Sequence, residues 1–352
     1  MGFFVLLPFY SEVEFFLFQH SPVMQQGNQT TVSQFFLLGL TVGSEQQQIV
    51  FMLFLCIYLI TMVGNLLILL AIVSDTHLHS PMYFFLANLS FTDICFTNMT
   101  VPKMLADIHR QHPTISFEGC LTQMYFFMFL VDLDNFLLAV MAYDQYIAIC
   151  HPLHYATLLN PKHCTLLVLI PWVISSLVSV LHLSLLSHLT FSDQREIPHF
   201  FCDLEPILRL ACSDTKINHL MISAIGGAVI FFPFTFILVT YVFIGSTVLR
   251  VPSTRGKWKT FSTCGSYLSA VSLFYRSIVG VYFLPSSAYS AERDKVAAIM
   301  YTIVIPMMNP FIYSLRSKDM KRALRRPFSS KSFSGVSELC HERHLYQLLV
   351  LG

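Results

Sequence analysis

The sequence predicts an all-α membrane protein in which seven transmembrane helices form a bundle, with the N-terminus outside the cell and the C-terminus in the cytoplasm. Three observations lead to this fold class. Hydrophobic residues make up 55% of the 352 residues and charged residues only 12%, whereas soluble domains carry about 25% charged residues. Seven apolar stretches each reach the roughly 20 residues that a helix needs to cross a bilayer. Lysine and arginine gather in segments that would then share one side of the membrane.

Composition also argues against several functions. The formal net charge is +1, which gives no support to a nucleic-acid partner. The nine cysteines include no CxxC pair, which argues against a zinc or redox motif. No HExxH or comparable set of nucleophile and base occurs in the apolar stretches, so the sequence does not predict an enzyme.

Residues 1–48 precede the first apolar stretch and are predicted to be extracellular. Within them, residues 1–23 are apolar and aromatic but carry two glutamates, so they are too short and too charged to span a membrane. They also lack the basic start of a signal peptide. We expect them to be disordered or, if Met24 is the initiating methionine, untranslated. Asn28 opens an Asn-Gln-Thr glycosylation acceptor, which would be reachable outside the cell.

Residues 49–315 form the predicted helical domain. Only helices satisfy their own backbone hydrogen bonds in lipid, so each apolar stretch is expected to be a helix. The seven predicted spans are 49–73, 81–105, 120–149, 164–183, 219–249, 261–284 and 296–315. Residues 316–352 follow as a cytoplasmic tail, which we expect to be disordered after about residue 326 because hydrophobic periodicity is lost there.

The basic residues predict the orientation. They lie between the fifth and sixth spans and after the seventh, whereas the segment before the first span has none. They are Arg250, Arg255, Lys257 and Lys259 in the loop, and Arg316, Lys318, Lys321, Arg322, Arg325 and Arg326 in the tail. The positive-inside rule therefore places the tail in the cytoplasm. No internal repeat is visible, which weighs against a membrane transporter, the alternative from another class.

The longest connection, residues 184–218, lies between the fourth and fifth spans and is expected outside the cell. It holds Cys202 and Cys212, and Cys120 opens the third span on the same side. Because the exterior is oxidising, a bridge between Cys120 and Cys202 is plausible and would tie the loop over the mouth of the bundle. The alternative is two free buried thiols.

Four polar residues, Asn65, Asp93, Asp134 and Asn309, lie within apolar spans. A charged group in mid-bilayer is costly, so these side chains should face the interior of the bundle. Alternating helix directions bring all four into the cytoplasmic-to-middle half, where they could hold a sodium ion or a water cluster. They could equally form interhelical hydrogen bonds that only hold the bundle together. No other cofactor is expected.

Prolines predict two interruptions near polar residues. Pro306 and Pro310 should bend the seventh helix, either as a hinge or as a static kink. Pro152 should end the third helix, just past the polar stretch Asp144-Gln145-Tyr146. This stretch lies where the helix meets water, so it could report events in the membrane to a partner, or could simply end the helix.

Four stretches resemble the signature motifs of vertebrate olfactory receptors, the odorant-sensing members of the rhodopsin-like G protein-coupled receptors. They are Pro-Met-Tyr-Phe-Phe-Leu-Ala-Asn-Leu-Ser (81–90), Met-Ala-Tyr-Asp-Gln-Tyr (141–146), Lys-Thr-Phe-Ser-Thr-Cys (259–264) and Pro-Met-Met-Asn-Pro-Phe-Ile-Tyr (306–313). The resemblance runs from about residue 28 to residue 326, with the motifs in the right order on the right spans. It implies a multi-pass plasma-membrane receptor whose partners are an odorant and a G protein.

The resemblance further implies a pocket for small volatile molecules in the outer half of the bundle. The candidates come from spans three, six and seven, and ordinary helix packing is the alternative for each. They are Phe127, Met128, Val131, Asp132, Tyr275, Ile278, Val279, Tyr282 and Thr302. Amine receptors have an acid where this chain has Phe127, and no lysine lies between residues 296 and 315 to hold retinal as in opsins.

The resemblance also implies how binding becomes a signal. A ligand would favour a state in which the inner end of span six swings away from span three. The opened groove would accept an olfactory stimulatory G protein, which raises cyclic AMP. The residues expected to border or control the groove are Asp144, Gln145, Tyr146, Asn309, Pro310 and Tyr313.

Three departures from the family pattern bear on signalling. Gln145 replaces an arginine and loses its charge, so we expect weak coupling. Arg276 stands in mid-span where the family has glycine, and its cost without a partner such as Asp132 should hinder surface delivery. Ser192 replaces a loop cysteine, which leaves Cys212 without its usual partner. A folded receptor that does not signal, or the product of a decaying gene, is therefore the main alternative.

Overall fold

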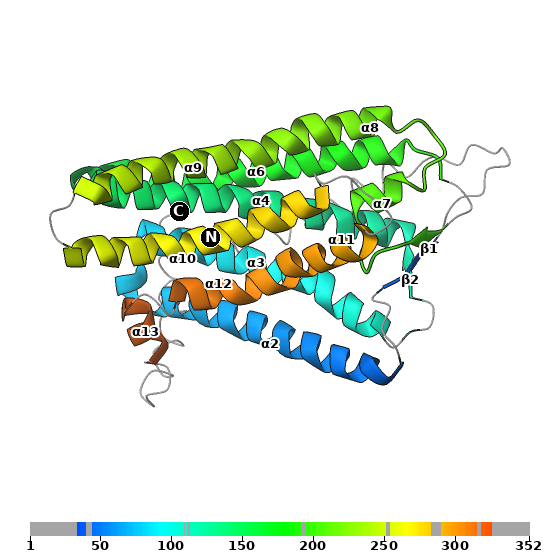
Figure 1. Cartoon of the computed structure of the whole chain (residues 1–352), viewed down its shortest axis with the longest axis horizontal. Coiled ribbons are helices and arrows are strands. Elements are labelled where there is room, and N and C mark those ends of the chain that lie inside the picture. Colours follow the sequence, from blue (N-terminus) through cyan, green and yellow to red (C-terminus); the bar gives the residue numbers. More distant parts are fainter. Residues whose placement is uncertain are drawn as a thin grey trace, which may run out of the picture.

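The computed structural model describes residues 34–39, 44–108, 110, 113–191, 195–250, 254–282, 290–314 and 318–325. In these residues the chain is a bundle whose long helices run side by side (Figure 1). Five of them are continuous: α2 (Ser44–Ser74), α3 (Pro81–Ile108), α4 (Phe117–Cys150), α6 (Pro161–Ser187) and α10 (Thr254–Tyr282). Met24, Asn28, Ser192 and the tail after residue 325 lie outside the described residues.

Two further long helices each consist of shorter segments, and we call them rods. The fifth rod, at the fifth predicted span, consists of α8 (Lys216–Met221), a π-helical turn over Ile222–Gly226 and α9 (Gly227–Arg250). The seventh rod, at the seventh predicted span, consists of α11 (Ser290–Ile299), a π-helical turn over Met300–Val304 and α12 (Ile305–Ser314). A π-helical turn is rare and often lies at a functional site.

Most ends of the helices and rods lie a few residues beyond the ends of the corresponding predicted spans. Within the described residues, five helices are long and apolar enough to cross a membrane, and they lie in α2, α4, α6, the fifth rod and the seventh rod. Helix α3 carries Asp93, Lys103 and Asp107, and in the described part of α10 the apolar stretch is the shorter Tyr267–Val279. Both nevertheless pack inside the bundle, α3 between α2 and α4, and α10 against the seventh rod.

Helix α4 is the centre of the bundle. It packs against α3, α6 and α9, and most of its side chains are buried. By contrast, α2, α6 and α9 expose large apolar side chains on their outer faces, for example Leu70, Leu177 and Val242. Helices that contact lipid have such outer faces. Ser116 caps the start of α4 by accepting from the Gly119 amide at 3.1 Å. The helix ends at Cys150, two residues before Pro152, as the proline predicted.

A small sheet covers one end of the bundle, which we call the sheet end. It consists of β1 (Gln34–Leu37), β2 (Thr114–Ser116) and β3 (Glu196–Ile197) in the order β2-β1-β3. Strand β1 pairs antiparallel with β2 and parallel with β3. Phe35 and Leu37 alternate inward and are buried. The sequence did not predict these strands.

The opposite end, which we call the α13 end, carries α13 (Lys318–Arg325) (Figure 1). Met320 and Ala323 of α13 pack on Ile68, Leu78 and Tyr83, while Lys321 and Arg322 are exposed. The remaining short elements are the 3₁₀ turns Thr76–Leu78 and Pro152–His154, α5 (Tyr155–Leu158) and α7 (Leu204–Leu208).

Candidate functional site

The candidate ligand residues lie on α4, α10 and the seventh rod, and several of them are buried. Those that are fully buried come from α4, α10 and the π-helical turn of the seventh rod, namely Phe127, Tyr275, Ile278 and Thr302. Met128, Val131, Asp132 and Val279 are half-buried. Tyr282 is the last residue of α10, and its side chain lies outside the described residues.

Phe127 contacts aromatic rings from three other parts of the chain. Its ring lies 4.6 Å from that of Phe201 in the long loop, 5.5 Å from that of Phe96 on α3 and 5.8 Å from that of Tyr301. Phe127 therefore packs against the seventh rod at Tyr301, the residue before Thr302. Phe201 is itself buried, so the long loop packs an aromatic ring directly against Phe127.

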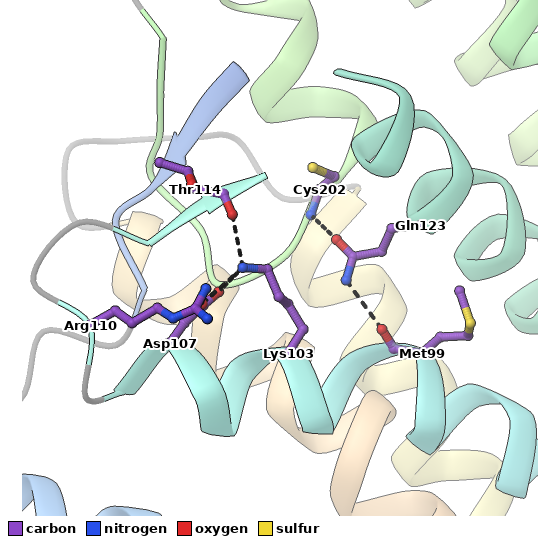
Figure 2. Close-up of polar contacts among 7 residues, drawn as sticks. All are labelled: Met99, Lys103, Asp107, Arg110, Thr114, Gln123 and Cys202. Atoms are coloured by element: carbon purple, nitrogen blue, oxygen red, sulfur yellow. Dashed lines mark hydrogen bonds and ion pairs between the residues drawn. The ribbon is translucent and has the colours of Figure 1, made fainter. Parts of the chain in front are cut away.

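The loop that carries Phe201 is fixed to α4 and α3. Cys120 and Cys202 form a disulfide with Cα atoms 5.4 Å apart, which confirms the predicted bridge. Gln123, one helical turn further along α4, accepts a hydrogen bond from the Cys202 amide at 3.0 Å and donates to the Met99 carbonyl at 3.2 Å. Figure 2 shows this amide lying between the two segments. Cys212 is exposed and free.

A second set of polar contacts holds the sheet. Lys103 points from the end of α3 to the Thr114 carbonyl of β2, at 2.9 Å, and to the Asp107 carboxylate, at 2.8 Å (Figure 2). Lys295 donates to the Gly39 carbonyl just after β1, at 2.8 Å. These bonds anchor two of the three strands to the helices beneath them.

His199 is buried in the same loop. Its ring stacks on Phe200 and meets Phe201 edge-on. Burial lowers the pKa of His199 to about 3, and the positive charge of Lys295 adds to this effect. The imidazole is therefore neutral at physiological pH.

Hydrogen bonds connect two of the four residues of the predicted polar cluster, Asn309 and Asp93. The Asn309 amide donates to both carboxylate oxygens of Asp93, at 3.1 and 2.9 Å. Asn65 donates to the Thr61 carbonyl and, across to the seventh rod, to the Pro306 carbonyl at 3.2 Å. Asp134 lies close enough to Asp93 to interact electrostatically. Within the described part of the chain, Asp134 Oδ1 and Asn65 Oδ1 are buried without a hydrogen-bond partner.

Asp144 and Gln145 are bound by tyrosines from other elements. Asp144 accepts from the Tyr155 hydroxyl of α5 at 2.8 Å, and Gln145 accepts from the Tyr241 hydroxyl of α9. The ring of Tyr241 stacks on that of Tyr267, whose hydroxyl donates to the Leu138 carbonyl. Burial, followed by the negative charge of Asp144, raises the pKa of Tyr155 above its usual value. Together these bonds join α4, α5, α9 and α10 at the α13 end.

The remaining predicted switch residues lie nearby. Tyr146 pairs with His151 at 3.1 Å, next to the end of α4. Pro310 lies against α2, where a side chain on Gly64 would approach the proline ring to 3.0 Å. The Tyr313 side chain lies outside the described residues, as do those of Arg255, Lys257 and Lys259.

Arg276, which the sequence places in mid-span, has Asp132 as its suggested partner. Its side chain is exposed on α10, and within the described residues no ion pair joins it to Asp132. The helix turns this residue away from the interior, a property that a position in mid-span does not predict.

Sequence reasoning also missed two buried amides, Gln123 and Asn135. Asn135 donates to the Val229 carbonyl of α9 at 2.7 Å and accepts from the Tyr275 hydroxyl. Both are polar residues in an apolar span, and that signal could have found them. Within the described residues no group of three or more histidine, cysteine or acidic side chains could hold a metal ion.

Comparisons with known proteins point to one family. Residues 54–331 match the family model described as Olfactory receptor. The chain is 51% identical over 311 residues to Olfactory receptor 1468 of Rattus norvegicus, covering 88% of this chain and 99% of that protein. It is 54% identical over 308 residues to Olfactory receptor 1S1 of Homo sapiens, covering 88% and 95%. It is also 54% identical over 305 residues to Olfactory receptor 1N1 of Homo sapiens, covering 87% and 98%.

The family accounts for features that length and composition leave open. It implies a seven-helix transmembrane bundle although two helices are less apolar, and it implies odorant ligands and coupling to a G protein. The chain belongs to the olfactory receptor family, and is thus a multi-pass plasma-membrane receptor of the G protein-coupled class and not an enzyme.

Proposed function

We propose that the chain binds small volatile molecules at the sheet end of the bundle, between α4, α10 and the seventh rod, with the N-terminus outside the cell. The observation that carries this proposal is the convergence on Phe127 of aromatic rings from α3, the long loop and the seventh rod. Tyr275 and Thr302 are buried hydroxyl-bearing candidates on α10 and the seventh rod. Mostly apolar walls with a few polar groups suit small hydrophobic ligands.

The proposed response is activation of a stimulatory olfactory G protein, which raises cyclic AMP. A ligand can drive this only by binding more tightly to the active state than to the resting state. The contacts between α10 and α4 at the α13 end are the ones that an outward swing of α10 would break. Leu153 is a candidate docking residue there, since it is 93% exposed in the turn that follows α4.

Gln145 should weaken this response. An arginine at this position could bond to a carboxylate or carbonyl with a full charge, whereas the amide offers weaker hydrogen bonds. The observation in support is that Gln145 is held by the neutral hydroxyl of Tyr241 and makes no bond to Asp144 among the described contacts. A folded receptor that does not signal remains the competing function.

A sodium ion is the one cofactor that the polar cluster suits. Asp93 and Asp134 would supply carboxylate oxygens, with Asn65 and Asn309 beside them. The fit rests on the two buried oxygens without partners, Asp134 Oδ1 and Asn65 Oδ1, because hard cations prefer such oxygen ligands. The ion would offset the repulsion between two nearby carboxylates.

The test is cyclic AMP output over an odorant panel in cells that display the chain at their surface. The Gln145→Arg variant is measured beside it at matched surface level, and we expect it to give the larger response. Phe127→Ala should weaken the response to any active odorant, whereas Phe311→Ala, an exposed aromatic on α12, should not. Equal output from the unaltered chain and from the Gln145→Arg variant would discard the coupling argument. Failure of every odorant on both would favour the non-signalling alternative.

Surface display is itself a test of Arg276. Because a cation exposed to lipid is costly, Arg276→Gly should increase antibody labelling of a tag at residue 1 on intact cells. A tag at residue 352 should remain inaccessible until the cells are permeabilised. Equal labelling of both tags on intact cells would contradict the proposed orientation.

A further inference from the structure

Prolines lie inside four of the described helices, α3, α6, α9 and α12. Proline has no backbone N–H, so the carbonyl four residues earlier loses its usual helical donor. In lipid no water replaces that donor, and the carbonyl needs another partner. A helix carbonyl points along the helix toward the residue four positions later. The side of the helix on which the proline lies therefore decides where that partner must come from.

Two of these carbonyls find a donor inside the bundle. Pro310 is buried, and Asn65 of α2 donates to the carbonyl four residues before it at 3.2 Å. Pro233 is buried as well, and Asn135 of α4 donates to the carbonyl four residues before it at 2.7 Å. In both cases a buried asparagine on a neighbouring helix replaces the missing N–H.

Pro102 of α3 is exposed, whereas the interior prolines of α6, α9 and α12 are buried. The carbonyl that Pro102 leaves without a helical donor belongs to Asn98, which is also exposed. These two residues continue a line of exposed positions on α3 that includes Phe84 and Ala106. The other side of α3, which carries Asp93, is buried in the bundle. The Asn98 carbonyl therefore lies on the side of α3 that faces lipid.

The Asn98 side chain is already occupied. Its amide nitrogen donates to the Ile94 carbonyl at 2.9 Å and to the Met62 sulfur at 3.4 Å. Its Oδ1 accepts from the Tyr58 hydroxyl of α2 at 2.7 Å. Within the described residues no side chain donates to the Asn98 carbonyl. An amide has two N–H donors, so only acceptors are left here, and this surface needs a donor from its surroundings.

We propose that this surface, between Tyr58 of α2 and Pro102 of α3, binds a sterol whose hydroxyl group donates to the Asn98 carbonyl. A sterol carries a single hydroxyl donor on a rigid apolar body. Asn98 lies about 7 Å along α3 from Lys103, the first charged residue toward the sheet end. Asn98 is thus inside the hydrocarbon, whereas the donors of phospholipid headgroups lie in the polar layer outside it.

The neighbouring surface of α2 suits the body of a sterol. Leu59, Val63 and Leu66 are 50%, 54% and 41% exposed, and all three are apolar. Val63 and Leu66 lie further toward the α13 end than Tyr58, which is the direction of the bilayer centre. A sterol with its hydroxyl at Asn98 would therefore extend its apolar rings along these side chains.

The test uses the purified full chain in lipid nanodiscs that contain a photoactivatable cholesterol analogue. Illumination followed by mass spectrometry of peptides should place the adduct on α2 or α3. Unlabelled cholesterol should compete for this labelling, and cholesterol methyl ether, which has no hydroxyl donor, should compete about fivefold less well. One hydrogen bond has a net value of about 1 kcal/mol, which corresponds to a factor of about five in binding. Equal competition by the two compounds would overturn the proposal.

Pro102→Ala is the decisive variant, because alanine returns an N–H to the Asn98 carbonyl. The helix gains a hydrogen bond, and labelling of α2 and α3 should fall about fivefold. Pro171→Ala is the matched control, since it also returns an N–H to a helix interior but at a buried proline of α6. It should leave the labelling of α2 and α3 unchanged. Unchanged labelling in Pro102→Ala, or an equal fall in both variants, would contradict the proposal.

Two further measurements keep the test decisive. If Pro102→Ala does not fold, the competition between cholesterol and its methyl ether in the unaltered chain still decides. If labelling is lost when two copies of the chain share a nanodisc at constant sterol content, the donor belongs to the second copy and the proposal is wrong. Neither readout needs an odorant or a G protein, so the result is independent of the proposed function.

Discussion

The Tyr267 hydroxyl offers a direct test of how the α13 end is held together. Tyr267 lies on α10, is buried, and donates a hydrogen bond to the Leu138 carbonyl on α4. If α10 swings away from α4 during signalling, this bond exists only in the resting state. Tyr267→Phe removes it and keeps the ring. A hydrogen bond has a net value of about 1 kcal/mol, and a factor of ten is about 1.4 kcal/mol, so the ratio of resting to active receptor should fall about fivefold.

The assay is ligand-independent cyclic AMP production, normalised to surface receptor, in the Gln145→Arg background. We expect Tyr267→Phe to raise this basal signal about fivefold. Tyr143→Phe is the matched control, because Tyr143 packs on Phe236 of α9 and its hydroxyl makes no hydrogen bond within the described part of the chain. Equal basal signals from the two variants at equal surface level would refute the reasoning.

Three further predictions concern stability. Cys120→Ser opens a bridge between residues 82 apart, a loss of about 4–5 kcal/mol in the chain-entropy model, so surface labelling should collapse while Cys212→Ser leaves it intact. Gly64→Ala forces a methyl group to within 3.0 Å of a proline ring on α12, whereas Gly245 has nothing within 4 Å; overpacking of this kind costs about 1–3 kcal/mol, so the melting temperature of the detergent-solubilised protein should fall for Gly64→Ala and not for Gly245→Ala. The pKa of His199 falls from 6.5 to about 3 on folding, so the unfolded chain binds the extra proton and stability is lost as pH falls from 6.5 toward 3. At about pH 5 this loss is about 2 kcal/mol. His199→Phe should therefore reduce the difference in melting temperature between about pH 7.5 and about pH 5. An unchanged difference would show that the ring is not buried as a neutral group.

The sequence predicted the helices because their signal is local. An apolar stretch of about 20 residues has few alternatives to a membrane helix. The Cys120–Cys202 bridge was also predictable, since few cysteines fall on the same side as the third span's start. Pro152 ended α4 where its missing donor requires.

The features that sequence reasoning missed depend on distant partners. Strand β1 exists because residues near 35, 115 and 197 meet at one end of the bundle, and no periodicity in a four-residue stretch reveals that. Asn135 finds its hydrogen-bond acceptor, the Val229 carbonyl, on another helix. Arg276 illustrates the same limit in reverse: a position in mid-span gives depth in the bilayer, but the direction of the side chain depends on how α10 is rotated.

Strand β1 has a practical consequence for handling this receptor. It is the middle strand, so deleting residues 34–37 would strip β2 and β3 of their shared neighbour and leave two unpaired edges. Epitopes, fluorophores and export sequences should therefore be joined ahead of residue 34. Shortened versions that begin at the first membrane helix would lack a part of the folded cover, even though every transmembrane segment is present.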